Sequence, residues 1–404
     1  MFKGSAMYEV HVLQDERWRI EAAFTEEQAA LSCARVQVTV SGIREVKVYK
    51  SRNLAGMALQ TAVFHRKVPE AKQRPLGLTG SADGAPYCTD LPDLYGFESR
   101  VVIGRLLRQF LDKHQVTPTE LLHGWSCARR LDEQGSLMGA AIHAAARHHA
   151  DTHKVAVAAR VKELRALVDR ALAKSRDFVA ERKRLPAFDE RDPAETSRRI
   201  ERAVGAEEHD FVFLALLSHH LTGSNTVFGK LELLVRLMAE GEDPRVSALL
   251  EGVVADGLGS ADVIKELLGA QPNLAAGLCA LADTVLGRPR GEKDAPVSSL
   301  LDRIGRLVVE GRAPCCRAVL VERIRSALGG EQPLDRRDSK AEATLVETIV
   351  ARLKDEDGTL LGGAETEKVL AKRLLRHRQA ILREQGMHDI ADRLPTTFRP
   401  GGGK

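Results

Sequence analysis

The spacing of apolar residues changes once along the chain, near residue 98, and this change limits the folds open to it. Up to residue 67, apolar and polar residues alternate over several short segments, as they do in strands with one buried face. After residue 98, apolar residues recur at every third or fourth position, which is the spacing of one helix face. The first such face consists of Ile103, Leu106, Leu107, Phe110 and Leu111. The sequence therefore predicts an α+β protein, with a small sheet-containing unit followed by a large, mainly α-helical region.

The N-terminal unit, residues 1–67, is predicted to be a two-layer ββαββ unit. Alternating segments predict four strands, at 8–13, 17–24, 43–50 and 57–65. After the second strand, Thr25 opens the sequence TEEQ, which predicts a capping box and a helix running toward Gly42. The segment before Met7 is interpreted as an extension that precedes the first strand.

A single helix covers one face of this sheet and leaves the other face open. The residues predicted to pack on the helix are Trp18, Ile20, Phe24, Val46 and Val48. The residues predicted to line the open face are Arg17, Arg19, Lys47 and Tyr49. Because side chains alternate along a strand, a shift of one residue in register would exchange the two sets.

The rest of the chain is divided by its proline and glycine residues. Residues 68–97 carry repeated Pro and Gly without a period, which predicts a linker or an irregular loop. A helical segment is predicted at 98–185, in which 135–184 forms one very long helix or a closely broken pair. Between positions 157 and 178, apolar residues at helical spacing predict a seam that pairs with another helix, in this chain or in a second copy.

Residues 186–395 are predicted to form an α-helical bundle or an irregular stack of helix pairs, and 396–404 a flexible tail. Several helix starts are marked by Pro after a capping residue, at Thr117-Pro118, Asp192-Pro193 and Asp243-Pro244. We find no fixed sequence period, so a strict solenoid is not indicated.

Composition excludes several classes of protein. The 404 residues are 44% hydrophobic and 29% charged, with a net charge of +4, which is ordinary for a globular protein. No stretch reaches the roughly 18 apolar residues of a membrane-spanning helix, so no membrane insertion is expected. The N-terminal residues lack the apolar core of a secretory signal, and the six irregularly spaced cysteines are typical of reduced thiols. A cytoplasmic location is therefore expected.

The segment 213–234 imitates a phosphate-binding P-loop. A P-loop has four residues between its glycines and Ser or Thr after its lysine. Here Gly223 and Gly229 enclose five residues, and Leu231 follows Lys230. The segment is instead predicted to be two helices joined by a turn, with Gly223 as a stop and Ser224 as a cap.

Two further motifs involve cysteine or serine. The sequence GWSCA at 124–128 imitates a nucleophile elbow, but the capped helix start that precedes it is not the strand that an elbow requires. The pair Cys315-Cys316 is predicted to be two small buried residues at a helix start rather than a disulfide. No catalytic residue and no cofactor are expected from either motif.

A histidine cluster, HAAARHHADTH at 143–153, is the strongest metal-binding pattern in the chain. His149 and His153 are four residues apart, so on a helix both rings project from one face and are candidate zinc ligands. His143 and His148 point elsewhere on the same helix, and the glutamate of an H-E-x-x-H motif is missing. The alternative is a polar helix face without metal.

A basic stripe is predicted near the C-terminus. Lys368, Lys372, Arg376 and Arg383 fall on one side of a helix, with Leu370, Leu374 and Ile381 on the other. This stripe is a candidate docking surface for an acidic protein partner, and with less support for nucleic acid, because no aromatic residues interleave for base stacking. A solvated surface is the other interpretation.

These observations favour a non-enzymatic cytoplasmic protein that acts in interaction or regulation, like a scaffold or adaptor, through its helical surfaces. A protein partner or self-association is expected. The alternatives are a helical metal-dependent enzyme that uses the histidine cluster at 143–153, and a nucleic-acid-associated protein that uses the C-terminal basic helix.

Overall fold

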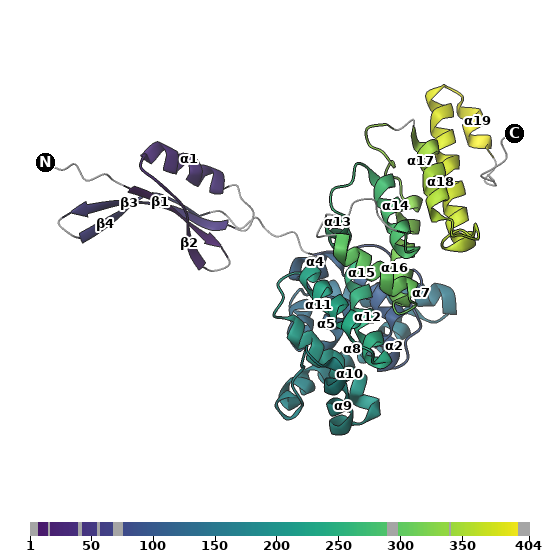
Figure 1. Ribbon diagram of the computed structural model, residues 1–404, viewed down its shortest axis with the longest axis horizontal. Helices are drawn as coiled ribbons and strands as arrows, with labels where there is room; N and C mark the ends of the chain where they lie inside the picture. Colours follow the sequence, from purple (N-terminus) through teal and green to yellow (C-terminus); the bar gives the residue numbers. More distant parts are fainter. Residues whose placement is uncertain are drawn as a thin grey trace. The chain divides into compact units, whose positions relative to one another are not determined.

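The computed structural model confirms the α+β class: a small antiparallel sheet precedes a large helical region (Figure 1). The chain divides into two compact units, Met1–Pro75 (the sheet unit) and Leu76–Lys404 (the helical unit). The structure describes residues 7–14, 17–38, 43–54, 57–67, 76–288, 298–338 and 341–394. The extension before Met7, the tail at 396–404 and residues 68–75 of the predicted linker lie outside the described residues.

The sheet unit has the predicted ββαββ order. Its elements are β1 (Met7–Gln14), β2 (Arg17–Phe24), α1 (Glu27–Gln37), β3 (Ile43–Leu54) and β4 (Met57–Lys67). The strands lie in the order β2-β1-β3-β4, all antiparallel, and α1 lies across one face (Figure 1). Thr25 does not cap α1 as predicted, since the N-cap position is Glu26 and no side chain caps the helix there.

The core of this unit is formed by small apolar side chains. Val10 and Val12 of β1 and Val46 and Val48 of β3 are fully buried against α1. The helix presents alanines at this contact, including the fully buried Ala30, and these let it approach the sheet closely. Val46 and Val48 thus pack as predicted, and Phe24 is partly buried in the same core.

The prediction for Trp18 and Ile20 is wrong, because a β-bulge interrupts the alternation of β2. Val10 pairs with Ala22, whereas His11 pairs with Ile20, so one extra residue separates the two pairs. The bulge moves Trp18 and Ile20 to the open face, where they are 43% and 58% exposed.

The same bulge changes the position of Arg19. It lies opposite the buried Val12, so it is on the helix side of this edge strand and not on the open face. Lys47 and Tyr49 do lie on the open face as predicted, where the Lys47 ammonium sits 4.3 Å from the Trp18 ring centroid. The side chain of Arg17 lies outside the described residues.

The helical unit begins with a stretch that is irregular but packed. Residues 76–90 contain no helix, and α2 (Leu91–Tyr95) follows. Ala82 and Cys88 are buried, and Leu76 and Leu78 contact the core of the helices that follow. The described part of the predicted linker is therefore part of the helical unit.

The described helices of the unit fall into two consecutive groups along the chain. The first group comprises α3 (Phe97–Leu106), α4 (Arg108–His114), α5 (Pro118–His123), α6 (Trp125–Asp132), α7 (Leu137–His153), α8 (Val157–Glu181) and the short 3-10 helix η1 (Arg182–Arg184). The second group comprises α9 (Pro193–Val204), α10 (Ala206–Leu221), α11 (Val227–Glu240), α12 (Pro244–Leu258), α13 (Ala261–Leu268), α14 (Leu274–Val285), α15 (Ser298–Val309), α16 (Pro314–Gly329), α17 (Glu342–Leu353), α18 (Gly363–Glu384) and α19 (His388–Arg393).

Several local signals are confirmed. Thr117 and Glu120 form a complete capping box at the start of α5, and Asp192 and Asp243 cap α9 and α12. The pair α7 and α8 is the predicted closely broken pair, because Lys154 adopts a left-handed conformation with φ 58° and ends α7. Among the helices that the structure describes, none combines the length and apolar character that a bilayer crossing requires.

The apolar seam of α8 packs inside the chain. Leu164, Ala171 and Phe178 are buried, and the partly buried Val161 and Val168 contact the same core that α7 contributes to. Ser175 lies in the seam and is fully buried, with its hydroxyl donating to the Leu172 carbonyl. The intramolecular version of the predicted pairing is therefore the one present in this structure.

A buried ion pair and a buried hydrogen bond to a carboxylate join helix α5 to helices much later in the chain. The Lys230 ammonium on α11 donates to Glu120 Oε1 on α5 at 2.7 Å, and both side chains are almost completely buried. Asp256 on α12 accepts from the Thr119 hydroxyl at 2.6 Å and from Arg100 Nε on α3 at 3.1 Å. A buried charge without its partner is strongly unfavourable, so these contacts restrict how the two groups of helices can pack.

We predict that Lys230→Met lowers the free energy of unfolding by about 3–5 kcal/mol, because it leaves the Glu120 carboxylate buried without a cation. The double variant Lys230→Met with Glu120→Gln should recover much of that loss, since it removes both charges. Urea denaturation measures both. Lys372→Met, at an exposed lysine with no partner among the described residues, is the control, and an equal loss there would contradict the assignment.

A buried histidine on helix α5, His123, should make the folded protein less stable in acid. His123 is buried between Tyr95 and Phe211, and its pKa is lowered from 6.5 to about 3, chiefly by burial, while its bond to the Thr119 carbonyl acts in the opposite direction. Between pH 6.5 and 3 the unfolded chain binds this proton and the folded chain does not, so stability is complete above pH 6.5 and falls with pH below it.

Between pH 7 and pH 5, His123 should remove about 2 kcal/mol of stability. His123→Gln should abolish this part of the pH dependence, even if it lowers stability at pH 7. Parallel urea titrations at the two pH values measure the difference, and an unchanged pH dependence in the variant would rule out His123 as its source.

Candidate functional site

The P-loop-like segment forms two helices joined by a turn, as predicted, and each helix packs mainly on other helices. Helix α10 precedes the turn and α11 follows it, with Gly229 inside α11. Thr226, not Ser224 as predicted, is the cap, and it accepts from the Gly229 N–H at 3.1 Å. Lys230 is committed to Glu120 and to the Gln115 carbonyl, so it is not available to a phosphate.

The cysteine motifs are built into helices. GWSCA follows helix α5 directly and forms the start of α6, so the strand of a nucleophile elbow is missing from this described segment. Burial raises the pKa of the Cys127 thiol, which disfavours the nucleophilic thiolate. Cys316 is buried at the start of α16 and Cys315 is half-buried beside it, and all six cysteines are free.

The histidine cluster lies on α7 but its members have different roles. His149 is buried, and its Nδ1 accepts from Arg160 Nε at 3.0 Å, so its Nε2 carries the proton and donates to the Ala85 carbonyl at 3.2 Å. Burial lowers the pKa of His149, which keeps the ring neutral. His153 is exposed, and its ring packs on Tyr87.

Both nitrogens of His149 are thus occupied, and this leaves no lone pair for a metal ion. His143 is exposed and His148 is half-buried near Asp83. Within the described ranges, no group of three or more His, Cys, Asp or Glu side chains is placed to hold a metal.

The residues of the predicted basic stripe are on α18 but mostly have partners. Lys368 pairs with Glu365 at 2.6 Å and Arg383 with Asp392 at 2.9 Å. Arg376 donates to the carbonyls of Gly329 and Gly330 at the end of α16, and with Arg383 it borders a hollow of about 340 Å³. Lys372 is exposed and has no partner in the described part of the chain.

The apolar side of the same helix differs partly from the prediction. Leu370 is buried and Leu374 partly buried, but Ile381 is 40% exposed. Arg373, which the stripe did not include, is buried and pairs with Glu342 at 2.6 Å. Reversing the charge of Arg376 would therefore disturb the α16 end as well as the surface.

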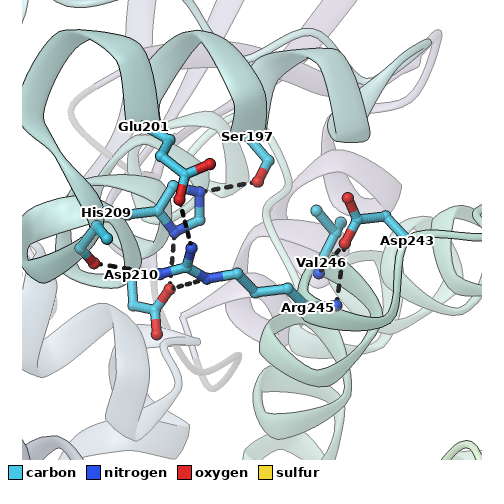
Figure 2. A network of polar contacts seen from close by, with 8 residues as sticks. Ser197, Glu201, His209, Asp210, Asp243, Arg245 and Val246 are labelled. Carbon is cyan, nitrogen blue, oxygen red and sulfur yellow. Dashed lines mark hydrogen bonds and ion pairs between the residues drawn. The ribbon is translucent and has the colours of Figure 1, made fainter.

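A serine–histidine–aspartate arrangement was not anticipated from the sequence (Figure 2). Ser197 on α9 lies 2.8 Å from His209 Nε2, and His209 Nδ1 lies 2.7 Å from Asp210 Oδ1 on α10. With Nδ1–H donating to the carboxylate, Nε2 of the imidazole accepts a hydrogen bond from the Ser197 hydroxyl. These are the contacts of a catalytic triad.

The surroundings of this triad oppose catalysis. Ser197 is 6% exposed in the interior of a helix and His209 is fully buried, so a substrate carbonyl cannot approach the hydroxyl. Asp210 also accepts from Arg245 Nε at 2.9 Å, and Arg245 bonds Glu201 at 3.2 Å (Figure 2). The network ties α9, α10 and the start of α12 together.

A groove lined by arginines is the most distinctive surface of the helical unit. It encloses about 710 Å³ between α3 and α4 on one side and the end of α12, the start of α13 and α16 on the other. Two acidic side chains line it, Asp256 and Glu322. Its arginines, which define the arginine groove, are Arg100, Arg105, Arg108, Arg317, Arg323 and Arg325.

Two of these arginines are neutralised inside the groove. Arg100 is buried and pairs with Asp256, and Arg325 pairs with Glu322 on the same helix. A Cβ on Gly252 would lie 2.6 Å from Arg100 Nη2, so glycine at that position of α12 makes room for the guanidinium.

Arg108 and Arg323 meet at Gly259. Arg323 Nη1 donates to the Gly259 carbonyl at 2.9 Å, and a Cβ on Gly259 would lie 2.9 Å from Arg108 Nη2. Burial and then the charge of Arg108 lower the pKa of Arg323, while Asp112 acts in the opposite direction. Asp112 also bonds Arg108 at 3.3 Å. The two guanidinium groups therefore repel each other in a partly desolvated place.

The other two arginines have no carboxylate partner. Arg105 donates to the carbonyls of Ser81 and Asp83, which bind the group without cancelling its charge. Arg317 is exposed and has no partner in the described ranges. With Arg323, the groove presents three such cations in the part of the chain that the structure describes.

No local signal in the sequence points to either arrangement. The groove joins arginines near residue 105 to arginines more than 200 residues later, and arginine is common along the whole chain. Ser197 and His209 come from two successive helices without a recognisable motif. Both sites depend on tertiary packing.

No family model matches this chain, and no curated protein or solved structure is significantly similar to it. Function must therefore be inferred from the site itself.

We predict that Ser197 is structural. Ser197→Ala should lower the free energy of unfolding by about 1–3 kcal/mol, because His209 loses a buried hydrogen-bond partner. Ser247→Ala, at a serine on α12 outside the network, should cost less. Covalent labelling of the folded wild-type protein by a fluorophosphonate at Ser197 would overturn this assignment and favour a hydrolase.

Proposed function

We propose that this is a non-enzymatic cytoplasmic interaction protein whose helical unit binds an acidic segment of a partner protein in the arginine groove. The observation that carries the proposal is the excess of positive charge there: six arginines line the groove against two acidic residues. Arg105, Arg317 and Arg323 have no carboxylate partner among the described residues.

An anion would relieve an unfavourable arrangement. Arg108 and Arg323 hold like charges close together beside Gly259, and Asp112, which bonds Arg108, offsets only part of the repulsion. A further carboxylate at Arg323 would reduce the repulsion that remains. Guanidinium groups bind carboxylates through two parallel hydrogen bonds, which makes arginine well suited to such recognition.

The chemistry of the groove favours an acidic protein over nucleic acid. Among the residues that line it, Phe97 is the single aromatic side chain, whereas single-stranded nucleic acid is bound by stacking bases on several aromatic rings. The net charge of +4 is also small for a nucleic-acid-binding chain. A second copy is not needed to cover the seam of α8, which packs within the chain.

The test is binding of a fluorescein-labelled peptide of alternating Glu and Ser, followed by fluorescence anisotropy. Arg317→Glu should weaken binding about tenfold, because it replaces a charge-assisted contact worth about 1.5 kcal/mol with repulsion. Arg317 is exposed, so the change should leave the fold intact. Raising the salt concentration should weaken the wild-type complex toward the affinity of the variant.

Lys372→Glu is the matched control, since it reverses one exposed charge on α18 that has no partner among the described residues and does not line the groove. It should leave the affinity unchanged. Equal weakening by the two variants would mean that the peptide senses only net charge. Tighter binding of a single-stranded oligothymidine than of the peptide would favour a nucleic-acid partner instead.

A further inference from the structure

A cavity separate from the arginine groove lies inside the first group of helices. It has a volume of about 140 Å³ and is bounded by α3, α5, α6, α7 and α8. Typical lining residues are Leu106, Leu121, Met138, Ile142, Leu164 and Val168. None of the lining side chains is exposed, and the lining surface is almost entirely apolar.

The few polar groups at its edge are already engaged with one another. The Cys88 thiol lies 3.2 Å from the Ser99 hydroxyl, which donates to the Asp93 carbonyl at 2.6 Å. His149 uses one nitrogen for the Ala85 carbonyl and the other for Arg160.

Arg160 holds these polar groups in place through hydrogen bonds. Its Nη2 donates to the Cys88 carbonyl at 2.7 Å, and its guanidinium lies 3.8 Å from the Tyr87 ring centroid. The arginine is buried, and Glu163 balances its charge at 2.9 Å. The cavity wall therefore offers no free donor or acceptor from these groups, and a ligand with a charge or a hydroxyl would lose its hydrogen bonds to water without replacement.

We propose that this cavity is a binding site for a small uncharged hydrocarbon. The size supports this class, because an apolar cavity of about 150 Å³ in another protein stays dry and binds benzene. The lining supports it too, since branched aliphatic side chains and the methionine thioether gain dispersion contacts with such a molecule. The site is independent of the proposed function of the groove.

The test uses benzene as the probe and the methyl group of Met138 as the reporter, with carbon-13 methionine methyl NMR of the full chain. Met138 lines the cavity, so a bound aromatic ring should shift its methyl resonance in a saturable manner. The resonance is assigned with Met138→Leu. Phenol has almost the same shape, and we expect it to bind at least about tenfold more weakly, because its hydroxyl finds no partner.

Ala145→Leu and Ala144→Leu are a matched pair on α7. Both alanines are partly buried, but only Ala145 lines the cavity. Filling the cavity with Ala145→Leu should abolish the benzene-induced shift, whereas Ala144→Leu should retain it. If Ala145→Leu does not fold, Ala141→Leu fills the same cavity from the preceding turn. Absence of a saturable shift in the wild type, equal binding of phenol, or full binding by the filled variant would each overturn the proposal.

Discussion

The packing of the helical unit depends on two carboxylates that are buried with their partners at helix α5: Glu120 of α5 itself and Asp256 of α12. Glu120 on α5 finds its cation in Lys230, 110 residues later, and Thr119 on the same helix finds its acceptor in Asp256, 137 residues later. A buried carboxylate or ammonium tolerates no sliding, because a small displacement leaves it unpaired in an apolar interior. The six-residue helix α5 is thus linked to α11 through Lys230 and to α12 through Asp256, and Asp256 also accepts from Arg100 on α3. Apolar packing brings the helices together, and these buried polar contacts determine which residues of neighbouring helices lie opposite each other.

The arginine groove is a consequence of that register. Asp256 neutralises Arg100 at its floor, and glycines of α12 and its end, Gly252 and Gly259, leave the space that the guanidinium groups of Arg100 and Arg108 occupy. Gly257 serves the opposite face of α12 in the same way, since a Cβ there would lie 2.8 Å from the Leu231 side chain. The glycines of α12 and its end therefore have two effects. They let α11 pack closely on α12, and they let arginine side chains gather at the groove.

The sequence predicted well those features that depend on interactions between residues close together in the chain, such as helix starts. The capping residues at the starts of α5, α9 and α12 bind N–H groups of their own helices, and a proline follows each of them. Thr117, Asp192 and Asp243 could therefore be recognised without knowing the fold. The face of β2 was misplaced because one extra residue in that strand, Glu21, reverses the alternation, and a glutamate does not mark a bulge. The groove, the cavity and the Ser197 network could not be predicted, because each joins side chains whose proximity is created only by tertiary packing.

Arginine shows most directly why residue type alone does not identify a binding surface. Arg373 and Arg376 belong to the same basic helix, yet the first is buried against Glu342 and the second closes the end of α16. Arg317 has the same side chain and a similar helical setting, but its charge is not cancelled within the described residues. Of these three arginines, only Arg317 can bind an anion without losing existing contacts. Arg373 and Arg376 would first have to give up hydrogen bonds that stabilise the fold. The groove therefore differs from the C-terminal stripe in gathering three arginines without a carboxylate partner among the described residues. In the stripe, Lys368 and Arg383 are paired with carboxylates, Arg376 is held by the end of α16, and Lys372 alone is unengaged in the described part of the chain.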